Sequence, residues 1–231
     1  MSNTFNAYHG SGAAIIQVSN EFDLDHETKQ QYQLILTAND MQGGSDPVGV
    51  TVDLTDEVEW GGKGVFVVSW VVAFGRSHAE VLIIPEDQDH WENDPQFSRK
   101  VWVERQEVVY TTVGAGPTLF SPNTLISRTN RSAIDEDTWV QRGTIDTAGQ
   151  VNDMIDLIFS LDGAYGDDRQ YDLTPNPNPA IDSWNSNSYA HGLLNALEAS
   201  GPISVSVNLG NDLFPGWDKP LQLFEFGIEE E

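Results

Sequence analysis

The sequence predicts an α+β protein: a small antiparallel β-module, followed by a larger domain in which an antiparallel sheet packs on two helices. Residues 32–38 and 48–54 alternate apolar and polar side chains, which is typical of half-buried strands. Residues 65–74 are a continuous apolar, β-branched run, typical of a strand buried on both faces or of two strands joined by a bend. Two segments, 147–163 and 182–197, repeat apolar residues at helical spacing.

The composition excludes several classes of partner and chemistry. The 231 residues include 36 acidic and 11 basic side chains, giving a formal net charge of −25. Such a surface repels phosphate backbones and anionic lipid, so we expect no nucleic-acid partner. The chain has no cysteine, which excludes disulfides, a thiolate nucleophile and thiolate metal sites.

Targeting signals are not visible. Residues 1–12 have neither a basic n-region nor an apolar h-region. The longest apolar run, residues 64–74, is too short to cross a bilayer, so we expect no membrane span. A cytoplasmic protein, export without an N-terminal signal and a fragment of a longer protein all remain open.

The first module, residues 1–60, is expected to contain three strands. Residues 14–18 form a short one, and 32–38 and 48–54 form an antiparallel hairpin across a glycine-punctuated loop. The Gly61-Gly62-Lys63 segment marks a boundary, and the second domain is expected to cover residues 61–231.

The segments FDLDHET, YQLILTANDMQG and VGVTVDLTDEVE resemble the C-terminal half of a cadherin repeat, over about residues 10–60. The resemblance implies calcium as a cofactor and neighbouring extracellular repeats as partners, since carboxylate oxygens suit this hard cation. Val58 stands where that family usually has Asn. The ligands implied by the match are Asp25, Glu27, Asp40, Asp56 and Glu59. Solvated acidic loops without a metal are the alternative.

In the second domain, residues 65–74 and 78–84 are expected to pair as a hairpin, followed by a polar loop. Residues 100–112 read as one long strand that bends or reaches solvent at its charged middle. It ends at a glycine-rich turn, TVGAGP, which is expected to constrain the backbone or to line a pocket. We expect a loop over 118–147, a helix over 147–163 begun by Thr147 or Gly149, and a further loop up to residue 181. Residues 204–209 read as a strand and 215–227 as a tail with anchoring aromatic residues.

The helix over 182–197 has a polar first turn that suggests a nucleophile. Asp182 or Ser183 is the expected cap. Ser186 lies at the polar end of the apolar stripe, where the helix dipole favours negative charge. His78, at the start of a buried strand, shares a strand face with Glu80, which can orient the imidazole. A capping serine in a polar turn is the alternative.

The order of these features, a strand histidine followed much later by Asn-Ser-Asn-Ser at a helix start, resembles the circularly permuted papain-like fold. This is the NlpC/P60 and lecithin:retinol acyltransferase type, and the resemblance covers about residues 65–225. It implies Ser186 in the place of the family's cysteine, with His78 as the base and Glu80 as the orienting residue. Asn185 and Asn187 are candidates for oxyanion donors or for shaping the helix start. Ser188 and His191 are expected to pair on the outer helix face.

These resemblances imply a hydrolase or acyltransferase acting on an amide or ester, with a small-molecule, peptide or lipid ester substrate. One alternative is a catalytically degenerate binding module of a large, secreted bacterial adhesin. Another is a calcium-dependent structural piece. An extracellular or cell-surface location without a conventional N-terminal signal peptide follows from the same resemblances.

Overall fold

The computed structural model describes strands 5–10, 13–18, 31–39, 45–53 and 59–60 by their backbone. It also describes residues 62–229, except 73–74, 104–105, 135–137 and 179. The chain divides into two compact units, Met1–Glu57 and Val58–Glu231. The division falls three positions before the boundary that the sequence predicts, because β5 (Glu59–Trp60) pairs with a strand of the second unit.

The first unit contains two antiparallel hairpins. β1 (Phe5–Gly10) pairs with β2 (Ala13–Val18), and β3 (Gln31–Asn39) pairs with β4 (Ser45–Asp53). The β3–β4 hairpin is the one that the alternating pattern predicts, and its register places Leu34 opposite Val50. β1 has no counterpart among the strands that the sequence predicts.

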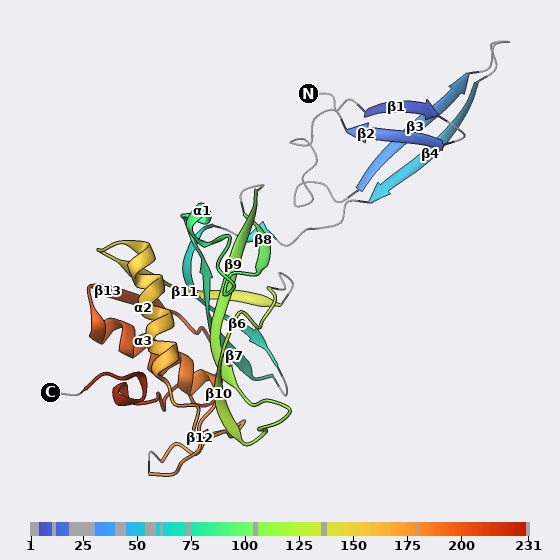
Figure 1. The fold of residues 1–231 in the computed structure, drawn as a ribbon. Coiled ribbons are helices and arrows are strands. Elements are labelled where there is room, and N and C mark those ends of the chain that lie inside the picture. Colours follow the sequence, from blue (N-terminus) through green and yellow to red (C-terminus); the bar gives the residue numbers. More distant parts are fainter. Residues whose placement is uncertain are drawn as a thin grey trace. The chain divides into compact units, whose positions relative to one another are not determined.

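The second unit is built on one nine-stranded sheet, drawn with its helices in Figure 1. Its main path runs β12-β10-β9-β7-β6-β11-β13, while β8 pairs with β9, and β5 pairs with β8. The pairs are antiparallel except β5 with β8. The strands are β6 (Gly64–Val71), β7 (Ser77–Ile84), β8 (Arg99–Val103), β9 (Gln106–Gly116), β10 (Thr124–Thr129), β11 (Trp139–Thr147), β12 (Arg169–Gln170) and β13 (Ile203–Val207).

Residues 81–84 of the central strand β7 are continuously apolar because both faces of the sheet are covered there. In β7, Val81 and Ile83 belong to the core shared with the helices. The alternate residues Leu82 and Ile84 belong to a second core, which includes residues of β8 and the first half of β9. All four side chains are fully buried, which accounts for the absence of polar alternation.

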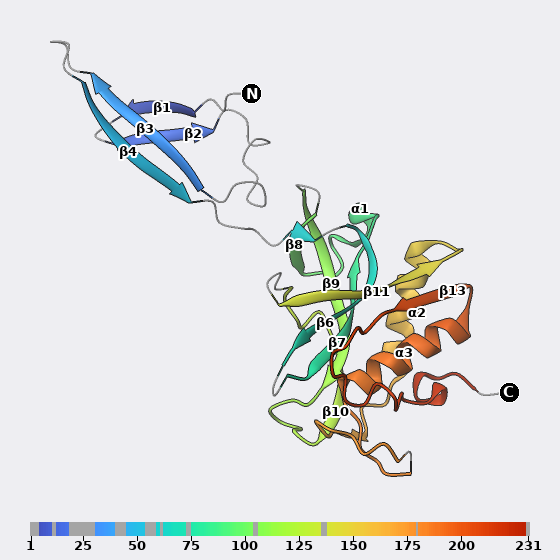
Figure 2. The same cartoon turned by 180° about the vertical axis from the view of Figure 1, so that it is seen from behind.

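Two longer helices lie on the same side of this sheet, as both views show (Figures 1 and 2). α3 (Ser186–Ser200) contacts β7, β9 and β13, and α2 (Val151–Ala164) packs on α3. The buried Tyr189 hydroxyl of α3 donates a hydrogen bond to Asp162 of α2. Burial raises the pKa of that carboxyl. The 3₁₀ helix η2 (Leu223–Phe226) contacts both helices, and α1 (Gln88–Trp91) is one short turn.

Several predicted boundaries were wrong. Residues 100–112 form not one bent strand but parts of the β8–β9 hairpin, and the TVGAGP segment continues β9 instead of turning. The expected loop over 118–147 contains β10 and β11. Both are rich in Ser, Thr, Gly or charged residues, so pairing with neighbouring strands, not local hydrophobic alternation, makes them strands.

The helix starts also differ from the expected ones. α2 begins at Val151 after Gln150, which makes no side-chain cap, so neither Thr147 nor Gly149 starts it. Among the described residues, no helix is long and apolar enough to span a membrane.

Candidate functional site

Asn185 sets the start of α3 at Ser186. Its side-chain oxygen accepts hydrogen bonds from the backbone N–H groups of Asn187 (3.0 Å) and Ser188 (3.1 Å), as an N-cap does. The two residues expected to cap the helix make other hydrogen bonds: Asp182 accepts from the Trp184 indole, and Ser183 donates to Asp172. Ser186 is therefore the first residue of the helix, closer to the dipole's positive end than the sequence predicts.

Asn187 fastens this helix start to the edge of β7. Its side-chain oxygen accepts from the backbone N–H of Ala79 (2.8 Å), and its amide nitrogen donates to the carbonyl of Ser77 (2.9 Å). β9 pairs with β7 only over residues 81–83, so the amide takes the place of a partner strand on the preceding residues. This double contact brings Ser186 beside His78.

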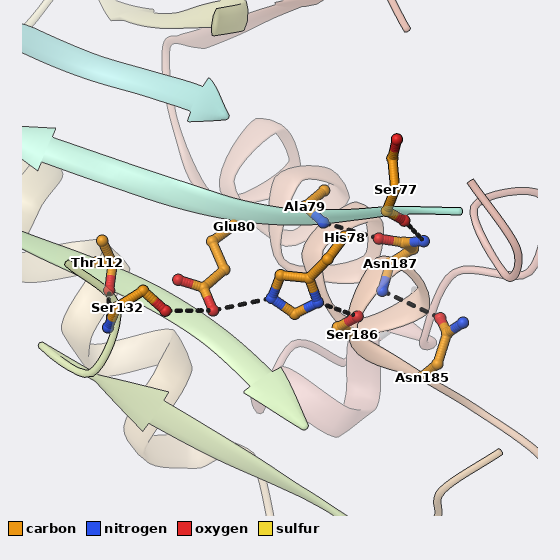
Figure 3. A network of polar contacts seen from close by, with 9 residues as sticks. All are labelled: Ser77, His78, Ala79, Glu80, Thr112, Ser132, Asn185, Ser186 and Asn187. Carbon is orange, nitrogen blue, oxygen red and sulfur yellow. Dashed lines mark hydrogen bonds and ion pairs between the residues drawn. The ribbon is translucent and has the colours of Figure 1, made fainter. Parts of the chain in front are cut away.

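His78 bridges Ser186 and Glu80 (Figure 3). Its Nδ1 lies 2.6 Å from the Ser186 Oγ, and its Nε2 lies 2.9 Å from the Glu80 Oε1. Because a carboxylate only accepts, Nε2 carries the proton and Nδ1 accepts the serine hydroxyl. The His78 and Glu80 side chains are 17% and 7% exposed. The structure thus joins the three residues predicted as nucleophile, base and orienting group, from positions 108 residues apart.

Glu80 accepts a second hydrogen bond and occupies the space that a glycine of the neighbouring strand leaves free. The Ser132 hydroxyl donates to the same Glu80 oxygen at 3.2 Å. Val81 pairs with Val113 across β7 and β9, so Gly114 is the residue beside Glu80 in the ladder. A Cβ on Gly114 would lie 2.4 Å from the Glu80 Cγ. The glycine-rich segment therefore makes room for this carboxylate.

Two adjoining hollows open at Ser186 and His78. The larger has a volume of about 210 Å³ and is lined by Trp70, Gly116 and Arg128, among others, while the smaller measures about 130 Å³. The Trp70 ring lies 4.4 Å from the His78 ring, tilted by 59°, and covers the imidazole. Ser186 and His78 line both hollows.

The two asparagines act at the helix start, which is the second of their two expected roles. The Asn185 amide donates to the carbonyl of Pro215 at 2.7 Å, and the Asn187 amide also donates to this carbonyl, at 3.0 Å. Since both amides already donate to main-chain carbonyls, their side chains are not placed to stabilise an oxyanion. The expected surface pair is wrong: Ser188 is fully buried and donates to the Gly216 carbonyl, while His191 contacts that of Trp217.

The predicted calcium ligands are not covered by the structure. Asp25, Glu27, Asp40 and Asp56 lie outside the described residues, and Glu59 is described by its backbone alone. Where side chains are described, from residue 62 onward, no group of three or more His, Asp or Glu is arranged to hold a metal ion. Calcium binding by the first unit remains a prediction.

Sequence reasoning missed three residues of the site, Trp70, Arg128 and Ser132, and marked a fourth, Gly114, only as part of a constrained glycine-rich segment. They come from β6, β9, β10 and the segment after it, and only the sheet register brings them to His78 and Glu80. Gly114 had a local signal, since a glycine inside a strand often marks a close approach of another group. The other three have no spacing that points to the site.

Comparison with protein-family models, with curated proteins and with solved structures gave no match.

Replacing Asn187 by Ala is expected to destabilise the second unit by about 2–4 kcal/mol, because it leaves the buried Ala79 N–H and Ser77 carbonyl unpaired. All seven tryptophans lie in this unit, so their fluorescence during urea unfolding measures its stability. Asn93→Ala, at an exposed position, is the control and should change stability by less than about 0.5 kcal/mol. An Asn187→Ala variant as stable as this control would contradict the tethering role.

Proposed function

We propose that the Val58–Glu231 unit is a hydrolase or acyltransferase that cleaves an ester or amide. Ser186 is the nucleophile, His78 the general base and then acid, and Glu80 the residue that positions the imidazole. The observation that carries this proposal is the 2.6 Å contact between the His78 Nδ1 and the Ser186 Oγ, with the opposite ring nitrogen held by a carboxylate.

The reaction has two halves. In the first, the Ser186 Oγ attacks the substrate carbonyl carbon while its proton passes to the His78 Nδ1. The tetrahedral intermediate then expels the alcohol or amine, which takes that proton, and an acyl-serine ester remains. In the second, water gives its proton to His78 and attacks the ester, releasing the acid and restoring the Ser186 hydroxyl. An acyltransferase replaces this water by another alcohol or amine.

The first turn of α3 offers electrostatic support for the oxyanion. The Ser186 N–H is one of the four helix-terminal donors that no helical carbonyl accepts. The Asn185 side-chain oxygen accepts the next two N–H groups, those of Asn187 and Ser188. The Ser186 N–H is therefore the remaining first-turn donor beside its own Oγ. The positive end of the helix dipole lies at the same place. Both features favour negative charge on the attacked carbonyl oxygen.

A binding module that has lost its chemistry is the alternative. It would need neither the carboxylate beneath His78 nor the glycine that leaves space for it. A buried carboxylate that is only partly hydrogen-bonded is unfavourable for folding, and Glu80 Oε2 has no partner among the described residues. Retention of such a group is typical of an active site and favours the enzyme.

The test is labelling of the full chain with a fluorophosphonate probe, followed by mass spectrometry of the modified peptide. We expect one label, on Ser186, that is absent from Ser186→Ala and from His78→Ala. Ser204→Ala removes an exposed serine of β13 and should leave labelling unchanged. Absence of label from the folded wild-type protein, or labelling that persists in Ser186→Ala, would refute the proposal.

A further inference from the structure

The cleft is positively charged in a strongly acidic protein. Three of the 11 basic residues, Arg76, Arg128 and Arg131, line the two hollows at Ser186. Glu80 is the one acidic side chain that lines them among the residues that the structure describes, and it already accepts hydrogen bonds from His78 and Ser132. If the 36 acidic and 11 basic residues were distributed by chance, the net charge of the cleft lining would be negative.

Arg128 makes no salt bridge with the described residues, although the nearby charge of Glu80 acts on it. It lies on β10 opposite Gly114, so the missing side chain of that glycine leaves open the space between Arg128 and Glu80. Its Nε and Nη2 atoms are buried without a hydrogen-bond partner. A buried donor left unpaired is unfavourable for folding, and an anionic ligand in the hollow would supply the missing acceptors.

The charge of Arg131 adds to this effect. Burial lowers the pKa of Arg128, and the nearby positive charge of Arg131 lowers it further, whereas the charge of Glu80 raises it by less. The two positive charges repel each other in the empty cleft, and both would attract an anion bound between them. The remaining wall is largely apolar, with Trp70, Ala115 and Pro117.

We infer that the substrate carries a negatively charged group, a carboxylate or phosphate, which binds Arg128 and Arg131 in the larger hollow a few bonds from the carbonyl attacked by Ser186. This inference rests on the proposed function and specifies its substrate class. A volume of about 210 Å³ equals roughly seven water molecules, so the hollow has room for a short acidic chain.

Binding is tested first without catalysis, in the Ser186→Ala protein, by calorimetric titration with glutarate, propyl phosphate and neutral glutaramide. We expect the better of the two anions to bind at least tenfold more tightly than glutaramide, and the tighter one identifies the charged group. Introducing Arg128→Gln into the Ser186→Ala protein should weaken anion binding at least tenfold. Lys100→Gln, which removes the same charge from an exposed position of β8, should not. Equal affinities for anions and glutaramide, or no effect of Arg128→Gln, would overturn the inference.

Kinetics then test the same preference during turnover. The substrates are 4-nitrophenyl hemiglutarate and its neutral methyl ester, and, for charge on the leaving group, 4-carboxyphenyl butyrate and its methyl ester. We expect kcat/KM to favour the charged member of at least one pair by tenfold or more, and Arg128→Gln to bring that ratio toward one. If Arg128→Gln slows both members of each pair equally, it merely positions Glu80 and the inference fails.

The two failures are distinguishable. Anion binding to the Ser186→Ala protein without probe labelling of the wild type would refute the hydrolase or acyltransferase and keep the anion site. Labelling of Ser186 without any preference for charge would keep the enzyme and refute the anion site.

Discussion

Replacing His78 by Ala is expected to lower kcat/KM for an activated ester about 10³-fold, within the usual contribution of a general base. The reason is that the Ser186 hydroxyl loses the only described acceptor in contact with it, so its proton has no destination as the bond to carbon forms. The measurement is release of 4-nitrophenol by the full chain, compared with wild type at equal concentration.

The interpretation requires that His78 and Ser186 act as a unit. The double variant His78→Ala/Ser186→Ala should then be no slower than Ser186→Ala alone, because the two losses are not additive. Added imidazole should restore part of the rate to His78→Ala but none to Ser186→Ala. His90→Ala is the matched control, since this histidine is exposed on α1. Unchanged turnover in His78→Ala would show that another group activates the serine.

Gly114→Ala is expected to reduce kcat/KM about 10²-fold although residue 114 does not touch the reacting atoms, because small displacements of catalytic groups have effects of this size. The new methyl group would lie 2.4 Å from the Glu80 Cγ, which forces the carboxylate away from the imidazole. The His78 Nε2–H then loses its acceptor, and the ring is free to rotate or adopt the other tautomer.

Two comparisons separate this mechanism from general destabilisation. In a Glu80→Ala background, Gly114→Ala should have no further effect on kcat/KM, since the clashing side chain is gone. Gly163→Ala, in α2 with nothing within 4 Å of the added Cβ, should leave kcat/KM unchanged. If Gly114→Ala slows the enzyme equally with and without Glu80, the glycine acts through the backbone of β9 instead.

The sequence predicted the elements that have a strong local signal. The apolar runs of β6 and β7 pair as expected, and the stripes of α2 and α3 are helical because their buried residues recur every three or four positions. It failed for β10 and β11, whose polar residues become strands only by pairing with β9 and β6. Their sequences are locally indistinguishable from loops.

By itself, the sequence determined which side chains were available: a serine at a helix start, a histidine and a glutamate on one strand face, and no cysteine. Only the tertiary structure decided that they meet, because contact across 108 residues depends on Asn187 bonding the unpaired edge of β7. It alone also aligned Glu80, Gly114 and Arg128 across three strands, since sheet register follows from long-range pairing and has no local signature.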